Sequence, residues 1–115
     1  MIFGDIYLVE IPASATEGRE QQGLRPAIIV QAPDNIDKIP TVLIIPFTTQ
    51  IKASNFPFTF TIYPDSLNNL YSVSIALVFQ LRAIDKKRIR NKIGKLNLDD
   101  MQILKQTIKT LLNIQ

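Results

Sequence analysis

Short apolar runs that alternate with compact polar turns limit what this chain can fold into. Each run, rich in Val, Ile, Phe or Leu, is soon closed by Pro, Gly, Asn or Asp, which favour turns. None approaches the roughly 18–20 apolar residues that a membrane-spanning helix needs, so we expect no association with a membrane. We expect strands at residues 5–11, 25–31, 41–47, 58–63 and 72–79, the last continuing to residue 84, and a short strand at residues 93–96.

The C-terminal segment changes from strand periodicity to helix periodicity. Asn97 can cap a helix, and Asp99 and Asp100 complement the dipole of its first turn. Apolar residues then recur on one stripe: Met101, Leu104, Ile108, Leu111 and Leu112. The pattern indicates a mainly β fold, a small β-barrel with a C-terminal α-helix that covers an open end or face. Given the length of 115 residues, we expect residues 1–115 to form a single domain.

Two residue types are missing, and their absence excludes several classes of chemistry. The chain has no cysteine, which excludes disulfides, thiolate catalysis and zinc–sulfur sites and fits a cytoplasmic protein. It has no histidine, which excludes Ser/His/Asp triads and histidine metal sites. The acidic pairs Asp34/Asp37 and Asp99/Asp100 lie in a turn and at a helix start, so we interpret them as structural. We expect neither a metal nor a cofactor.

Charge is unevenly distributed along the chain. Residues 1–79 carry 4 basic and 7 acidic residues, whereas residues 80–115 carry 9 basic and 3 acidic residues. A basic C-terminal third favours a polyanionic partner such as nucleic acid. A solvated basic face on a helix explains the charge equally well, and residues 85–89 are themselves expected to form one helical turn with an acidic start.

Polar side chains stand where two apolar runs begin or end. Arg25 opens the run of residues 25–31, and Thr48 follows the run of residues 41–47. A guanidinium and a hydroxyl placed together can hold a phosphate, and RNA cleavage by the adjacent 2′-hydroxyl needs only positioning, charge stabilisation and proton transfer. The alternatives are a salt bridge from Arg25 to Glu20 or Glu17, and a backbone hydrogen bond from Thr48.

Four motifs in sequence order are similar to those of one known family. They are Gly-Asp-Ile-Tyr at residues 4–7, Gly-Arg-Glu-Gln-Gln-Gly-Leu-Arg-Pro at residues 18–26, Ile-Pro-Phe-Thr-Thr-Gln at residues 45–50 and Gln-Leu-Arg-Ala-Ile-Asp-Lys-Lys-Arg at residues 80–88. Together with the terminal helix, they make nearly the whole chain resemble the MazF/PemK toxins of type II toxin–antitoxin systems.

The resemblance implies an SH3-like (CcdB/MazF-type) barrel, a homodimer and a cytoplasmic toxin. It implies sequence-specific, metal-independent cleavage of single-stranded RNA to 2′,3′-cyclic phosphate and 5′-hydroxyl ends. It also implies a cognate antitoxin whose disordered, acidic C-terminal segment occupies the RNA groove, and DNA binding only through such a complex.

The resemblance also implies roles for individual residues. Arg25 matches the family's catalytic arginine, Thr48 its catalytic threonine, and Glu20 an acidic residue near the site. The remaining matches fall where the family contacts RNA: Gln21, Thr49, Gln50 and Gln80. Lys52 lies in a loop, residues 51–55, whose shape we expect to differ from the family's; it is a further candidate for contact with an RNA phosphate and is otherwise a plain surface lysine.

Several residues depart from the family pattern or allow another interpretation. Gln22 replaces a small residue in the first loop, and Phe79 stands where many members have glutamate. Phe56 could stack on a base, although packing at the core or its rim is the simpler interpretation. Two rival functions remain: a gyrase poison that acts through its C-terminal helix, and an inactive relative that only binds an antitoxin.

Overall fold

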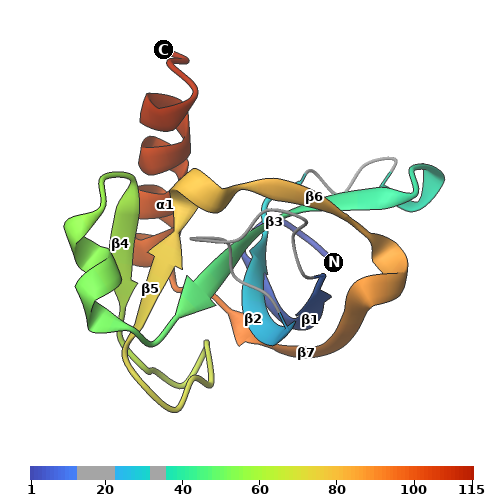
Figure 1. Cartoon of the computed structure of the whole chain (residues 1–115), viewed down its shortest axis with the longest axis horizontal. Coiled ribbons are helices and arrows are strands. Elements are labelled where there is room, and N and C mark those ends of the chain that lie inside the picture. The colour runs from blue at the N-terminus through green and yellow to red at the C-terminus, as the bar shows by residue number, and fades with distance from the viewer. Residues whose placement is uncertain (13–22, 32–35) are drawn as a thin grey trace.

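The structure is a computed structural model, and it describes residues 1–12, 23–31 and 36–115. Over these residues the chain forms seven strands and one helix (Figure 1): β1 (Asp5–Ile11), β2 (Gly23–Ile29), β3 (Thr41–Thr48), β4 (Thr59–Ile62), β5 (Ser74–Leu77), β6 (Arg82–Asp85), β7 (Ile89–Lys95) and α1 (Leu98–Leu111). Four short 3-10 turns connect them: η1 (Ile36–Lys38), η2 (Ile51–Asn55), η3 (Val78–Gln80) and η4 (Lys86–Arg88).

The strands form one antiparallel sheet in the order β4-β5-β3-β2-β1-β7, with β6 paired to β3. β3 is the central strand because β2 occupies one of its edges, while β5 and β6 occupy successive stretches of the other. Figure 1 shows the sheet curling, with the ribbon of β6 turning down into β7. The expected mainly β architecture with a C-terminal helix is confirmed.

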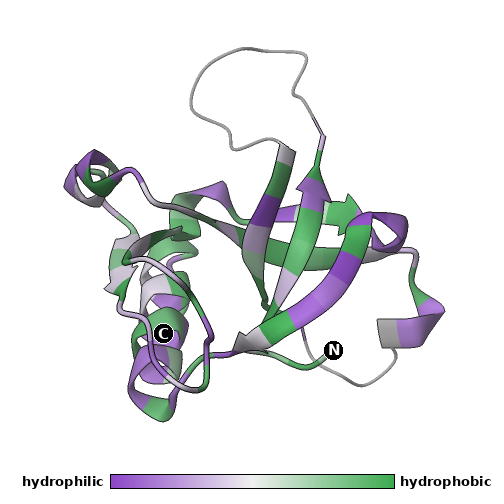
Figure 2. Cartoon of the chain, turned by 90° about the horizontal axis from the view of Figure 1, so that it is seen from below, coloured by the Kyte–Doolittle hydropathy of each residue, from purple (hydrophilic) through white to green (hydrophobic). Residues whose placement is uncertain are grey.

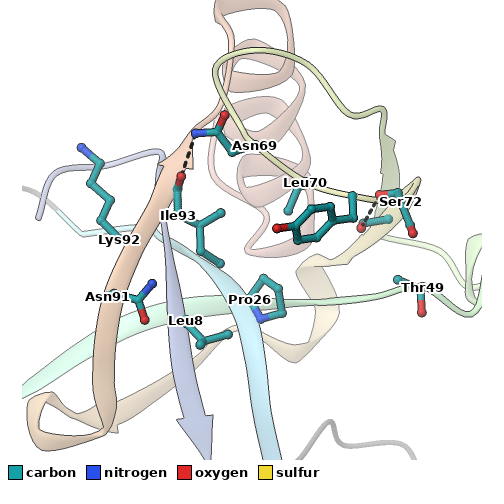
Figure 3. A pocket seen from close by; sticks show the side chains of 11 residues that line it. Leu8, Pro26, Thr49, Asn69, Leu70, Ser72, Asn91, Lys92 and Ile93 are labelled. Carbon is teal, nitrogen blue, oxygen red and sulfur yellow. Dashed lines mark hydrogen bonds between the residues drawn. The ribbon is translucent and has the colours of Figure 1, made fainter.

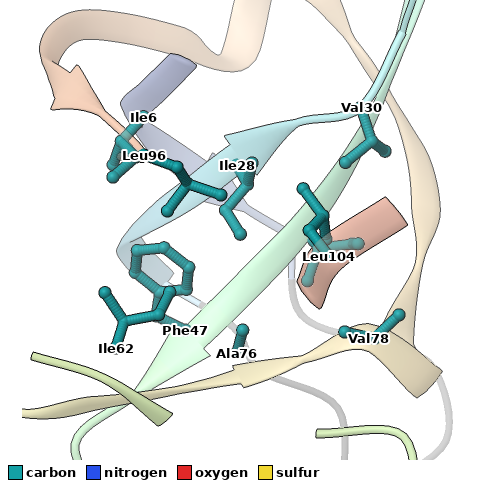
Figure 4. Packing of buried hydrophobic residues seen from close by; sticks show 10 residues of the cluster. Ile6, Ile28, Val30, Phe47, Ile62, Ala76, Val78, Leu96 and Leu104 are labelled. Carbon is teal, nitrogen blue, oxygen red and sulfur yellow. The ribbon is translucent and has the colours of Figure 1, made fainter. Parts of the chain in front are cut away.

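Both faces of β2 are buried over its second half, which accounts for the continuous apolar run there. Along β2, Ile28 packs in one apolar cluster, whereas Ala27 and Ile29 pack in another. Neighbouring residues of a strand point to opposite faces, so the two clusters lie on the two sides of the sheet. Figure 4 shows the first cluster, in which Phe47 and Ile62 lie near each other.

Helix α1 covers the first cluster and contacts β4 and η3. Leu104 is completely buried within that cluster. The predicted cap is present, since the Asn97 side-chain oxygen accepts a 2.8 Å hydrogen bond from the backbone N–H of Asp100. Leu112, however, is 50% exposed. It lies beyond the last helical residue, as the C-cap, so it does not belong to the predicted stripe.

Two other expectations differ from the structure. The run of residues 72–84 is not one strand, because η3 interrupts it and transfers the chain from β5 to β6. The last strand, expected at residues 93–96, already begins at Ile89. Its first half is charged, and β7 is largely hydrophilic in colour in Figure 2, so apolar alternation gives no signal for it.

Candidate functional site

Arg25 and Thr48 lie at matching positions on paired strands. β2 and β3 pair with Ala27 opposite Pro46, Ile28 opposite Ile45 and Ile29 opposite Ile44. Continuing this antiparallel register by two residues on each strand places Arg25 opposite Thr48. Residues directly opposite each other point to the same face of a sheet, so the geometry brings the two predicted catalytic side chains towards one side.

That side is the face of the second apolar cluster. Arg25 also lies opposite Val9 of β1, which is completely buried in the cluster. Arg25 itself is exposed, whereas Thr48 is only 5% exposed. The pair therefore lies at the margin of the cluster, where β2 begins and β3 ends. Arg25 contributes a long, exposed cationic side chain, and Thr48 contributes a buried hydroxyl.

The Thr48 hydroxyl is held by the backbone that follows it. Its Oγ1 accepts a 3.1 Å hydrogen bond from the backbone N–H of Gln50. A hydrogen bond between Thr48 and the backbone, the alternative to a catalytic role, is thus present. It uses only one lone pair of the Thr48 hydroxyl oxygen. A threonine hydroxyl has one O–H donor besides its acceptor sites, so Thr48 retains a proton to donate to a ligand.

The other predicted contact residues differ in how the structure places them. Thr49 and Gln50 are exposed and directly follow Thr48, and Lys52 is exposed on η2, which contacts β4 and β5. Gln80 is half-buried at the end of η3. Glu20, Gln21, Gln22 and the alternative partner Glu17 lie outside the described residues.

Phe56 and Phe79 pack against each other. Their ring centroids are 5.4 Å apart with planes tilted by 52°, a favourable aromatic geometry. The packing interpretation of Phe56 is therefore confirmed, while 41% of the residue stays exposed. Phe79 therefore makes an apolar ring contact at this position.

The basic charge of the C-terminal third lies mainly before the helix. Residues 82–95, which we call the basic segment, hold seven of the nine cations, and α1 holds only Lys105 and Lys109. Part of this charge is paired: Glu10 accepts from Arg88 at 3.1 Å and from Arg90 at 2.7 Å. Three of these cations form the expected helical turn, η4, so the charge belongs to η4 and its neighbouring strands rather than to α1.

A pocket of about 560 Å³ lies beside the strand ends that carry Arg25 and Thr48. Part of its lining is apolar, from Leu8, Pro26, Leu70 and Ile93, and the rest carries polar groups, from Thr49, Asn69, Tyr71, Ser72, Ser74, Asn91 and Lys92. Figure 3 shows Pro26, Leu8 and Asn91 along adjacent strands. Sequence reasoning missed the pocket, because most of these residues fall in a turn and on a strand without apolar alternation.

The turn that builds one wall of the pocket is tightly fixed. Asp65 Oδ1 accepts hydrogen bonds from the backbone of Leu67 at 2.9 Å and Asn68 at 2.7 Å. The completely buried Asn68 accepts from the backbone of Asp65 and Leu70 and donates to the Tyr63 carbonyl at 2.9 Å. The turn is therefore locked by its own side chains.

Two carboxyls near this turn have shifted pKa values of opposite sign. Hydrogen bonds from the Asn68 backbone, the Asn97 side chain and the Leu67 backbone lower the pKa of Asp65. Burial, followed by the neighbouring Asp65 and Asp99 charges, raises the pKa of Asp100. Asn97 links the two, because it donates to Asp65 Oδ2 at 2.9 Å while capping α1. The turn and the helix start are thus one polar network.

Neither a metal centre nor a membrane span is present in the part of the chain that the structure describes. Within residues 1–12, 23–31 and 36–115, no three acidic side chains gather closely enough to hold a metal ion. Over the same residues, no helix combines the length and the apolar character needed to cross a membrane.

Comparison with known proteins places the chain in a family. Residues 3–112 match the model of the PemK-like, MazF-like toxins of type II toxin–antitoxin systems. The endoribonuclease MazF of Staphylococcus saprophyticus is 31% identical over 105 residues, which cover 91% of this chain and 85% of that protein. The chain is thus homologous to an endoribonuclease.

Solved structures agree on the fold. MazF from Deinococcus radiodurans superposes with a TM-score of 0.78 at 20% identity, covering 99% of this chain and 97% of that one. A mycobacterial endoribonuclease in complex with its cognate antitoxin superposes with a TM-score of 0.74 at 15% identity, covering 100% and 97%. The fold is MazF-like, and the chain belongs to the PemK-like, MazF-like toxin family of type II toxin–antitoxin systems.

Proposed function

We propose that this protein is a sequence-specific endoribonuclease toxin that cleaves single-stranded RNA without a metal ion. Family membership supports the reaction class. The observation that carries the proposal is the β2–β3 register, which sets Arg25 opposite Thr48 when continued by two residues. A guanidinium and a fixed hydroxyl on one face suit a phosphodiester group.

The proposed reaction is an internal transesterification. The 2′-hydroxyl oxygen attacks the adjacent phosphorus, and the bond from phosphorus to the 5′-oxygen breaks. The proton of the 2′-hydroxyl is removed and the 5′-oxygen gains one, so the products are a 2′,3′-cyclic phosphate and a 5′-hydroxyl. Charge accumulates on the non-bridging phosphoryl oxygens, where fixed donors stabilise the transition state most strongly.

Arg25 and Thr48 would share the stabilisation of that charge. The guanidinium of Arg25 offers a planar fork of donors to two phosphoryl oxygens. A guanidinium has five N–H donors and no acceptor atom, so Arg25 is not assigned the role of base. Thr48 would orient the phosphate with its remaining O–H. Glu20 would either take part in proton transfer or position Arg25.

RNA outside the cleaved bond would follow the neighbouring polar surface. Gln21, Thr49, Gln50, Lys52 and Gln80 are the proposed contacts, and the basic segment would attract the backbone over a longer range. The exposure of Thr49, Gln50 and Lys52 supports this assignment.

The proposed partners are a second copy of the chain and a cognate antitoxin. A MazE–MazF complex from Deinococcus radiodurans and the mycobacterial complex have been solved. By analogy, an antitoxin of this toxin would place an acidic, disordered segment over the RNA-binding surface, and DNA would be bound only by the joint complex. The cytoplasm, where messenger RNA is translated, is the proposed location.

Cleavage of a long RNA in the presence of EDTA tests the proposal. We expect the wild type to produce cyclic-phosphate ends, and Arg25→Ala to lose about a hundredfold or more in rate, as for other fixed transition-state donors. Arg25→Lys, which keeps the charge without the fork, should stay impaired. Lys109→Ala on α1 is the matched control and should cleave normally.

Failure of the wild type to cleave any of several diverse RNAs would overturn the nuclease assignment. Inhibition of DNA gyrase by the same preparation would then favour the rival role as a gyrase poison.

A further inference from the structure

The pocket beside the strand ends has the chemistry of a base-binding site. Its lining combines the apolar side chains of Leu8, Pro26 and Ile93 with amide and hydroxyl groups from Asn69, Ser72 and Asn91. No carboxylate lines it among the described residues. Its volume of about 560 Å³ lies within the roughly 300–1,000 Å³ typical of small-ligand sites.

The pocket adjoins the proposed catalytic pair along the chain. Pro26 follows Arg25, and Thr49 follows Thr48, so both strands contribute one residue to the pair and the next to the pocket. Adjacent residues of a strand point to opposite faces. An RNA strand that crosses the strand ends would therefore leave its scissile phosphate on one side and a flanking nucleotide on the other.

Tyr71 is the aromatic side chain of the pocket. It lines the pocket and yet is 103% exposed, meaning that its ring is completely open to solvent. A single exposed aromatic residue is unremarkable by itself. Here the turn that precedes Tyr71 is held by the Asp65 and Asn68 hydrogen bonds, which reach as far as the Leu70 backbone.

The polar part of the lining retains unused hydrogen-bonding capacity. The Asn69 amide donates to the Ile93 carbonyl at 2.9 Å, which fixes the side chain and leaves its carbonyl oxygen as an acceptor. Asn69 also has a left-handed backbone, with φ of 55°, a conformation that asparagine tolerates better than most residues. Asn91 stands across the pocket on β7, where Figure 3 shows its amide beside Leu8.

We propose that this pocket binds the base of one nucleotide that flanks the cleaved bond, with Tyr71 stacking on the base and Asn91 contacting its edge. The proposal rests on the proposed function, because it assigns a specificity subsite to the same RNA substrate. Stacking on an aromatic side chain accepts any base, so Asn91 would supply the discrimination and Tyr71 the affinity.

Sequencing the cleavage ends of one long RNA tests the subsite. Tyr71→Ala should lower kcat/KM about tenfold, the order that base stacking contributes, whereas Tyr71→Phe, which keeps the ring, should stay close to the wild type. Asn91→Asp should change the base preferred at one position beside the cut. Tyr63→Ala is the matched control, an exposed tyrosine outside the pocket, and should leave the cleavage pattern unchanged.

Binding of nucleoside monophosphates supplies a readout that does not need cleavage. With AMP, GMP, CMP and UMP as probes, NMR amide shifts should concentrate at residues 69–72 and 91–93 and disappear in Tyr71→Ala. Absence of such shifts would overturn the proposal even if the protein cleaves RNA. NMR shifts at these residues without any RNA cleavage would support base binding in the pocket and would contradict the nuclease assignment.

A change of oligomeric state would also overturn the proposal. If Tyr71→Ala converts a dimer into monomers in sedimentation equilibrium, the pocket is a subunit contact rather than a base site. Equal thermal unfolding of the variant and the wild type would show that Tyr71→Ala keeps the fold.

Discussion

At the scale of single residues, the site depends on how strand pairing places two side chains that are distant in sequence. Arg25 and Thr48 were recognisable as candidates because each stands where an apolar run begins or ends. Their alignment across β2 and β3 depends on the register, which no sequence motif specifies by itself. The bond from the Gln50 N–H to Thr48 was one of two alternatives, and the structure shows that it coexists with a free donor proton.

Replacement of Thr48 separates the two roles of its hydroxyl. Thr48→Val keeps the shape but removes the O–H, so we expect a loss of about a hundredfold in kcat, the size seen for a lost transition-state donor. The Gln50 N–H also loses its acceptor, and stability should fall by about 1 kcal/mol. Thr48→Ser should recover both. Single-turnover cleavage and thermal unfolding measure the effects, and an unchanged kcat in Thr48→Val would remove Thr48 from catalysis.

At the scale of elements, sequence periodicity predicts those segments whose environment is uniform. Residues 5–11 and the helix from its Asn97 cap agree with the structure, because burial on one face or both leaves a clear apolar pattern. The first half of β7 was not predicted, because its residues are charged and leave no apolar pattern. Arg90 and Lys92 form ion pairs with Glu10 and Asp5 of the neighbouring strand β1. The pocket was missed for a related reason: its wall is a turn whose order comes from polar side chains, which no apolar period records.

Close packing between β7 and the pocket turn should make Gly94 intolerant of a side chain. A Cβ at Gly94 would overlap the backbone of Leu67 and Asn68, where the Lys95 N–H bonds to the Leu67 carbonyl at 3.0 Å. Because backbone cannot rotate away, Gly94→Ala should cost about 1–3 kcal/mol, as overpacking does. Denaturant unfolding measures the cost, with the exposed neighbour Lys95→Ala as control. Equal stability of the two variants would contradict the proposed contact.

At the scale of the whole molecule, the described cations of the basic segment and the proposed site lie on the antiparallel sheet and its connecting turn. The helix α1 instead covers the first apolar cluster. Only Lys105 and Lys109 lie on α1, whereas the basic segment runs from β6 through η4 to β7. Composition alone could not distinguish these arrangements, because it records charge along the chain and not in space. The fold thus gathers most of its C-terminal cations on β6, η4 and β7, where Arg88, Arg90 and Lys92 also form ion pairs with β1.

Salt dependence of RNA binding tests whether the basic segment tracks the backbone. A 2′-O-methyl oligonucleotide of random sequence lacks the attacking hydroxyl and can be bound without being cut. Affinity should fall as salt rises, because each neutralised phosphate of a single strand contributes a slope of about −0.7 in log affinity against log salt. Lys87→Gln, in the basic segment, should reduce the slope by about one such step, whereas Lys109→Gln on α1 should not. An affinity independent of salt, or equal slopes for both variants, would contradict a role for the basic segment. The reason is that only cations that contact phosphates contribute to the slope of log affinity against log salt.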